Sequence, residues 1–145
     1  MDSIDYYDFS NNMAKLNRSI TSFVNKGLEK HNLTRSEVPY LMTLYKHESV
    51  TQEFLSRYYD LNEGTITRAL VRLEKKGFIK RVSNPDDKRK RMVSLTDEGL
   101  ELAVMLIDYQ KHIKEQVYYT FTDGEYNQLV ELLNKMFENI NNILE

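Results

Sequence analysis

The sequence of 145 residues contains no cysteine, only 2 prolines and 5 glycines, and no apolar run near the length of a membrane span. Without cysteine there are no disulfides, thiolate zinc ligands, cysteine nucleophiles or thiol redox sensors. So few prolines and glycines argue against long linkers. The first residues, MDSIDYYDFSNN, are acidic and polar. We therefore expect no secretory signal, a cytoplasmic location and no membrane partner.

Charge is distributed unevenly along the chain, although the net charge of -2 would not by itself indicate a nucleic acid partner. The segment from Arg57 to Arg91 contains eleven basic and five acidic residues, so it carries +6 and leaves -8 for the remainder. A basic middle between acidic ends calls for an explanation, and a negatively charged partner is one.

The spacing of apolar residues predicts a mainly α-helical chain. Steps of three and four recur through six segments, which is the pattern of amphipathic helices. These segments are approximately residues 6–30, 35–45, 52–59, 63–76, 97–121 and 123–144. The last five segments each follow a residue suited to cap a helix, and these residues are Thr34, Thr51, Asn62, Thr96 and Thr122. A glutamate three positions after Thr34 and after Thr122 predicts two capping boxes.

Two β-prone runs interrupt the helical pattern. Gly77 follows the fourth helix as a left-handed stop. Residues 78–82 and 91–95 then favour strands, and the Asn-Pro turn between them predicts a hairpin. The third and fourth helices, joined by a tight turn, make a helix-turn-helix. A short β-hairpin directly after a helix-turn-helix is a wing, and its basic tip extends from the body of the domain.

Four motifs accompany these elements. They are TITR at 65–68, LEKKGFI at 73–79, DKR at 87–89 and LTDEG at 95–99. Each motif is weak alone, but in this order and spacing they resemble those of the MarR family of winged helix-turn-helix transcriptional regulators. The resemblance implies that the N- and C-terminal helices form a dimerisation region. It divides a single compact domain into the N-terminal helix, the DNA-binding lobe and the two last helices, at residues 1–32, 33–96 and 97–145.

The fourth helix is then the recognition helix, and its N-terminal half would enter the major groove of DNA. Its candidate contacts are Gly64, Thr65, Thr67, Arg68 and Arg72. Arginine can bind a guanine edge through two hydrogen bonds, and threonine can offer its hydroxyl or contact a thymine methyl. Glycine would let the backbone approach. The alternative for the two arginines is a solvated helix face with salt bridges.

The hairpin tip carries four consecutive basic residues, Lys88, Arg89, Lys90 and Arg91. By the resemblance, Arg89 would insert into the minor groove, where narrow A·T tracts attract arginine. The other three would contact phosphates or steer the protein toward them. Asp87 would hold an arginine in place through a charged hydrogen bond. The alternative is an exposed hairpin that serves solubility.

The last helix is apolar on more than one side, which is typical of a helix that buries part of its surface in a partner subunit. The resemblance implies a two-fold homodimer that places two recognition helices on half-sites of a near-palindrome. The candidate dimerisation residues are Phe9, Met13, Leu129, Leu133, Met136, Phe137, Ile140, Ile143 and Leu144. A core within one chain is the alternative.

We expect that the protein is not an enzyme and that it has no cofactor or metal site. The sequence shows no recognisable nucleophile-base pair, phosphate-binding glycine loop or cluster of metal ligands. His31, His47 and His112 are scattered rather than set at ligand spacing. The resemblance implies a repressor released by a small phenolic or anionic effector, whose binding residues we do not assign. The alternative function is a winged-helix protein-interaction module that does not bind DNA.

Overall fold

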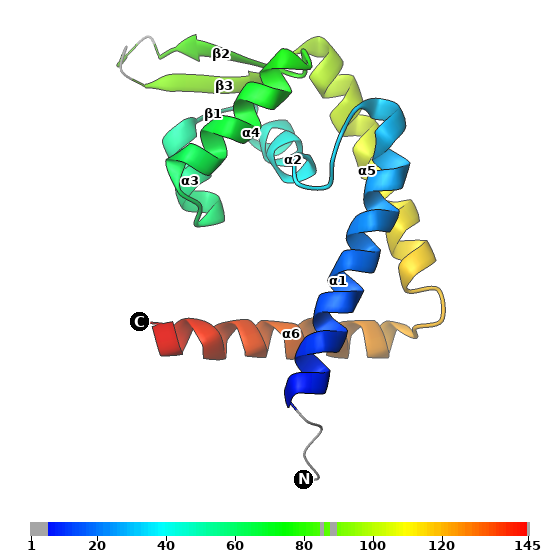
Figure 1. Cartoon of the computed structure of the whole chain (residues 1–145). Coiled ribbons are helices and arrows are strands. Elements are labelled where there is room, and N and C mark those ends of the chain that lie inside the picture. Colours follow the sequence, from blue (N-terminus) through cyan, green and yellow to red (C-terminus); the bar gives the residue numbers. More distant parts are fainter. Residues whose placement is uncertain (1–5, 85, 88–89, 145) are drawn as a thin grey trace. The chain divides into compact units, whose positions relative to one another are not determined.

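Helix α1 (Tyr6–Leu28) comes first in the chain, as Figure 1 shows. It passes directly into one turn of 3-10 helix, η1 (Glu29–His31). The computed structural model describes residues 6–84, 86–87 and 90–144. Asn32 ends η1 in the left-handed conformation, with φ of 54°. The helix predicted over residues 6–30 is confirmed, with its last turn tightened.

Helix α2 (Val38–His47) begins later than predicted, and the cap assigned to Thr34 is wrong. The Thr34 hydroxyl donates to the Glu37 carboxylate at 3.1 Å, so residues 34–37 form a turn and Glu37 takes the N-cap position. The other half of the predicted capping box is present, because Glu37 Oε2 accepts from Thr34 N at 3.0 Å. Pro39 lies in the first turn of α2, where its missing N–H costs no helical hydrogen bond.

Helices α3 (Gln52–Tyr59) and α4 (Glu63–Lys75) form the helix-turn-helix. Asn62 caps α4 as predicted, accepting from Thr65 N at 2.9 Å. Thr51 caps α3 in the same way, through Phe54 N at 3.1 Å. Asp60 adopts φ of 50° in the turn between the two helices. Gly77 stands in the left-handed conformation after α4, with φ of 80°, as the sequence predicts.

The wing is part of a three-stranded antiparallel sheet rather than an isolated hairpin. Strands β2 (Ile79–Ser83) and β3 (Arg91–Leu95) form the predicted hairpin. A third strand, β1 (Ser49–Thr51), pairs with β3 on its other edge, so the order is β1-β3-β2. The sequence did not predict β1, because three residues are too few to show a periodicity.

Helix α5 (Asp97–Val117) starts where the wing meets the end of α4. The Thr96 hydroxyl donates to Gly77 O at 2.6 Å and accepts from Gly99 N at 3.1 Å. A Cβ on Gly99 would lie 1.9 Å from Phe78 O, so only glycine permits this approach of helix to strand. The helix is four residues shorter than the predicted 97–121.

The chain forms two compact units, Met1–Ile107 and Asp108–Glu145. The first has a core of fully buried aliphatic side chains. They include Leu41, Leu44, Leu55, Ile66, Leu70, Leu73, Val93 and Leu106. These positions come from α2, α3, α4, β3 and α5, so the core supports the recognition helix along its inner face.

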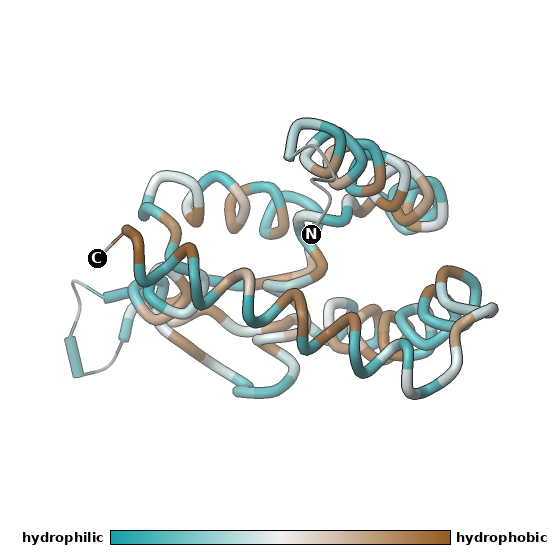
Figure 2. Tube along the Cα trace, turned by 90° about the horizontal axis from the view of Figure 1, so that it is seen from below, coloured by the Kyte–Doolittle hydropathy of each residue, from teal (hydrophilic) through white to brown (hydrophobic). Residues whose placement is uncertain are grey.

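The second unit consists of the end of α5 and helix α6 (Asp123–Leu144). The predicted capping box at the start of α6 is confirmed: Glu125 Oε2 accepts from Thr122 N at 2.8 Å, and Thr122 Oγ1 accepts from Glu125 N at 3.3 Å. Apolar residues recur along the whole of α6, which ends at C in Figure 2. Among the described residues, no helix is long and apolar enough to cross a membrane.

Candidate nucleic-acid interface

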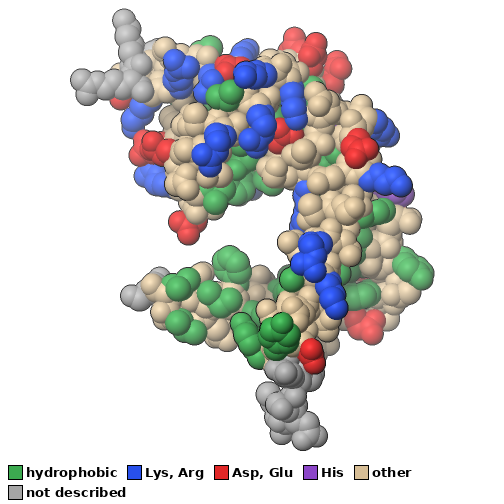
Figure 3. All heavy atoms as spheres, viewed as in Figure 1, with side chains coloured by type: hydrophobic (Ala, Val, Ile, Leu, Met, Phe, Trp, Pro, Cys, Tyr) green, Lys and Arg blue, Asp and Glu red, His purple; other side chains and the backbone are tan. Residues whose placement is uncertain are grey.

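The first turns of α4 present an exposed polar surface. Arg68 is exposed, and its Nη2 donates to Thr65 Oγ1 at 3.2 Å. A guanidinium has five N–H donors, so this bond orients Arg68 and leaves donors for a base edge. Figure 3 shows Lys and Arg side chains gathered over the winged-helix elements.

Thr67 belongs to a hydrogen-bond chain within the protein. Its hydroxyl accepts from Gln52 Nε2 at 2.7 Å and donates to Glu63 O at 2.8 Å. This chain joins the first turn of α3 to the first turn of α4. Our sequence reasoning missed Gln52, although its place directly after the Thr51 cap put it at the start of α3, facing the next helix.

Gly64 is exposed in the first turn of α4. A Cβ there would meet only Asn62 Oδ1, at 3.4 Å, which is ordinary van der Waals contact. Neither crowding nor a positive φ requires glycine at this position within the chain. The absent side chain leaves the helix backbone accessible to a ligand.

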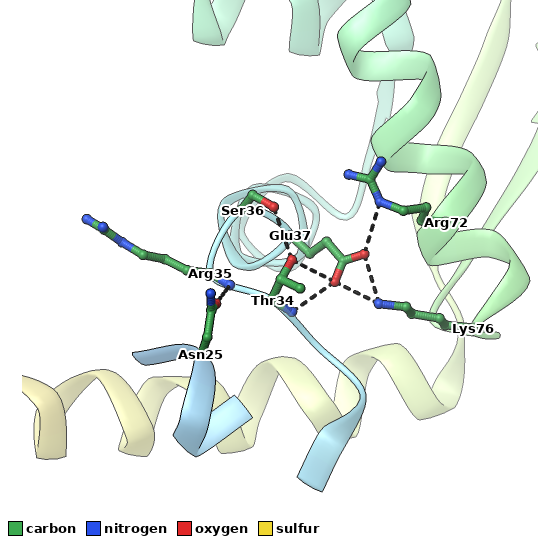
Figure 4. A network of polar contacts seen from close by, with 7 residues as sticks. All are labelled: Asn25, Thr34, Arg35, Ser36, Glu37, Arg72 and Lys76. Carbon is green, nitrogen blue, oxygen red and sulfur yellow. Dashed lines mark hydrogen bonds and ion pairs between the residues drawn. The ribbon is translucent and has the colours of Figure 1, made fainter. Parts of the chain in front are cut away.

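Arg72 lies near the other end of α4 and faces an acid. Its Nε is 3.5 Å from Glu37 Oε1, while the Arg72 side chain stays half-exposed. Glu37 itself is buried and accepts from Lys76 Nζ at 2.8 and 2.9 Å, as Figure 4 shows. Burial raises the pKa of Glu37, but the hydrogen bonds from Lys76 and Thr34 outweigh this effect, and the pKa lies below its ordinary value.

The wing is tied to both helices of the helix-turn-helix. Arg81 on β2 is bonded to Glu74 on α4, with its Nε 2.9 Å from Glu74 Oε2. This bond from Arg81 lowers the pKa of Glu74 more than desolvation raises it. Lys90 Nζ lies 3.3 Å from Glu53 Oε2 on α3. A polar cavity of about 330 Å³ separates α3, α4 and β3, with Gln52 and Lys90 in its lining.

The wing residues predicted to contact DNA are only partly described. Lys90 and Arg91 are exposed at the start of β3. The main-chain carbonyl of Asp87 accepts from Lys90 N at 2.9 Å, which closes the turn. Lys88 and Arg89 lie outside the described residues, so the minor-groove role of Arg89 stays a prediction.

The predicted dimerisation residues are mostly exposed on this chain. Leu129 is half-buried and the other eight are exposed, with Phe137 at 70% and Ile143 at 81%. No described residue of α6 is buried. Figure 3 shows hydrophobic side chains along α6.

The described residues contain no group of three or more His, Asp or Glu side chains placed to hold a metal ion. His47 packs edge-to-face against Phe54 and Tyr58, with ring centroids 5.4 and 6.3 Å apart. This histidine is therefore part of an aromatic cluster on α2 and α3.

A helix-turn-helix followed by a hairpin, with a basic and exposed recognition helix, defines the winged-helix class of DNA-binding proteins. The model of the MarR family matches residues 33–90. The regulator SarZ of Staphylococcus haemolyticus is 32% identical over 114 residues, covering 77% of this chain and 75% of SarZ. The regulator BilQ of Clostridioides difficile is 27% identical over 135 residues, covering 90% of this chain and 88% of BilQ. The chain therefore belongs to the MarR family of transcriptional regulators.

Solved structures share the fold. A MepR-DNA complex from S. aureus superimposes with a TM-score of 0.83 at 20% identity, covering 91% of this chain and 97% of MepR. The transcriptional regulator SlyA gives a TM-score of 0.81 at 23% identity, covering 92% of this chain and 94% of SlyA. Both likenesses confirm the winged helix-turn-helix architecture predicted from the sequence.

Proposed function

We propose that this protein is a homodimeric repressor that binds a near-palindromic operator in double-stranded DNA. One observation carries the proposal: Arg68, oriented by Thr65, projects from the exposed N-terminal half of a capped recognition helix. Its guanidinium can bind a guanine edge bidentately, which is the commonest specific contact in the major groove. A solvated helix face needs no such orientation.

The wing supplies the second set of contacts. Lys90 and Arg91 stand where the hairpin loop meets β3, next to the same helix-turn-helix. Positive charges here would neutralise phosphates and release counterions, which makes affinity fall with salt. Arg89, at the tip, would enter the minor groove. MepR, which shares the fold, was solved in complex with DNA, and this supports DNA binding by the present chain.

Dimerisation follows from the apolar surface of the terminal helices. Exposed groups of large apolar side chains are typical of protein interfaces. A two-fold dimer would carry two recognition helices spaced by about one helical turn of DNA, roughly 34 Å, and would therefore bind a near-palindrome. Bound at a promoter, such a dimer would block polymerase. A small phenolic or anionic effector would release it by changing the spacing of the helices.

The test is selection of genomic fragments by the purified protein, followed by titration of the best site across salt. Wild type, Arg68→Ala and Arg18→Ala would be compared, because Arg18 on α1 gives the same loss of charge outside the interface. We expect a near-palindromic site, a linear fall of log affinity with log salt, and a loss of about 1–3 kcal/mol for Arg68→Ala only. Equilibrium sedimentation should give a dimer.

Failure to enrich any site, with feeble binding at low salt, would favour a protein-interaction module instead. Protein that is refolded from denaturant belongs in the same selection, because a co-purified effector would otherwise keep a true repressor off DNA. Enrichment by the refolded sample alone would reveal such an effector.

A further inference from the structure

Glu37 is a buried carboxylate that no direct contact with DNA uses. It is 0% exposed, and it lies at the junction between the turn 34–37 and α2. An isolated buried charge is strongly unfavourable, so such a group is retained only with partners. Its partners identify what it holds together.

One partner, Thr34, lies three positions before Glu37, whereas Lys76 lies 39 positions after it. Thr34 donates to Glu37 Oε2 from its backbone N–H at 3.0 Å and from its hydroxyl at 3.1 Å. Lys76 donates to both carboxylate oxygens, and Arg72 Nε lies 3.5 Å away. Arg72 and Lys76 are one helical turn apart at the C-terminal end of α4. The carboxylate therefore joins the η1–α2 connection to that end of the recognition helix.

The connection is itself fixed to α1. Arg35 N donates to Asn25 Oδ1 at 2.6 Å, as Figure 4 shows. The Arg35 guanidinium continues along α1, donating from Nη1 to Thr21 Oγ1 at 2.5 Å and to Asn17 Oδ1 at 3.1 Å. Polar contacts thus extend from α1 through residues 34–37 to α4.

The contact of Glu37 with the C-terminal end of α4 also affects the position of the N-terminal end, which would face DNA. With 13 residues, α4 is about 20 Å long at 1.5 Å per residue, so a tilt of about 5° displaces its far end by roughly 2 Å. Hydrogen bonds to base edges tolerate only about 0.5 Å in length. Flexible lysines can still follow phosphates after such a shift.

We propose that Glu37 is a positioning residue for DNA recognition, which fixes the orientation of α4 through Lys76 and Arg72. Arg72 then serves this contact and does not read a base. The inference rests on the proposed DNA binding and adds to it the residues that aim Arg68.

The test compares Glu37→Gln, Lys76→Met, the double variant and Arg72→Ala as full-length proteins. Each is titrated on the selected operator and on a scrambled duplex of equal composition. All titrations use one salt concentration and a temperature well below the unfolding temperature of every variant. Glu125→Gln is the matched control, because Glu125 makes the same capping-box bonds to Thr122 in α6. Circular dichroism and thermal unfolding monitor the fold.

We expect Glu37→Gln to weaken operator binding at least tenfold while scrambled-duplex binding stays within twofold. Lys76→Met should do the same, and the double variant should lose no more than either single variant, because both remove one contact. Arg72→Ala should weaken operator binding without relaxing the preference at any single base pair. Glu125→Gln should bind both duplexes as the wild type does.

Two results would overturn the proposal: an unchanged specificity ratio in Glu37→Gln, as equal losses on both duplexes would give, or relaxed preference at one base pair in Arg72→Ala. If Glu37→Gln does not fold, Lys76→Met decides, since Lys76 is partly exposed. A wild type that does not discriminate between the duplexes would refute the proposed function itself, which separates the two failures.

Discussion

Gln52 Nε2 and Thr67 Oγ1 are 2.7 Å apart, so the first turns of α3 and α4 are joined by a side-chain hydrogen bond. Thr67 was predicted as a DNA contact, and its hydroxyl also donates to Glu63 O at 2.8 Å. With its proton and one lone pair engaged, this hydroxyl can offer a base only its remaining lone pair. Thr67 therefore acts first on the geometry of the helix-turn-helix.

Thr67→Val tests that role, because valine keeps the shape and removes both hydrogen bonds. Gln52 would lose its acceptor, and we expect a loss of about 1–2 kcal/mol in the free energy of unfolding. Thr67→Ser retains the hydroxyl and should stay near wild type. Urea denaturation of the three proteins measures the effect, and equal stability of the valine and serine variants would refute the assignment.

Gly64→Ala separates the stability of α4 from its approach to DNA. The chain has room for a Cβ here, and alanine is favoured over glycine in a helix by about 1 kcal/mol. We expect a more stable protein that binds its operator more weakly, since a methyl group would hold the backbone away from DNA. Gly124→Ala in α6 is the control, because its Cβ would meet Thr122 Oγ1 only at 4.0 Å. Unchanged operator affinity in Gly64→Ala would remove Gly64 from the interface.

Gly99→Ala should disrupt the junction of α5 with the wing. The new Cβ would lie 1.9 Å from Phe78 O, the atom that accepts from Thr96 N. Backbone cannot move aside as a flexible side chain does, so we expect a loss of about 3 kcal/mol or more. Thermal unfolding measures this, with Gly124→Ala as the tolerated substitution. A variant as stable as wild type would show that α5 shifts freely at its start.

What the sequence could predict depended on the range of the interactions involved. The caps at Asn62 and Thr122 were predictable because each side chain bonds a backbone N–H three residues away. Strand β1 was not, because its pairing joins Ser49 to Ser94, and neither segment signals the other. The contact between Glu37 and Lys76 was missed for the same reason. In the sequence, Glu37 already had a local hydrogen-bond partner in Thr34. Its contact with Lys76 forms only when the chain folds.

The pH dependence of stability gives a separate measure of the Glu37 contact. The pKa of Glu37 is lowered in the folded protein, because the bonds from Lys76 and Thr34 outweigh burial. A lowered pKa means that the stabilisation is complete above the unfolded pKa, about 4.3, and is lost as pH falls through the folded pKa. Lys76 and Arg72 are the cations that face the carboxylate.

Glu37→Gln should therefore be less stable than wild type at pH 7, and the difference should narrow as pH falls below about 4, near the unfolded pKa of a glutamate. Glu74 also has a lowered pKa, through its bond to Arg81, and titrates in both proteins. Subtracting the two urea-denaturation profiles cancels that contribution and isolates Glu37. A difference that stayed constant from pH 7 to pH 3 would mean that the charge of Glu37 contributes nothing, and that the variant is weakened by packing alone.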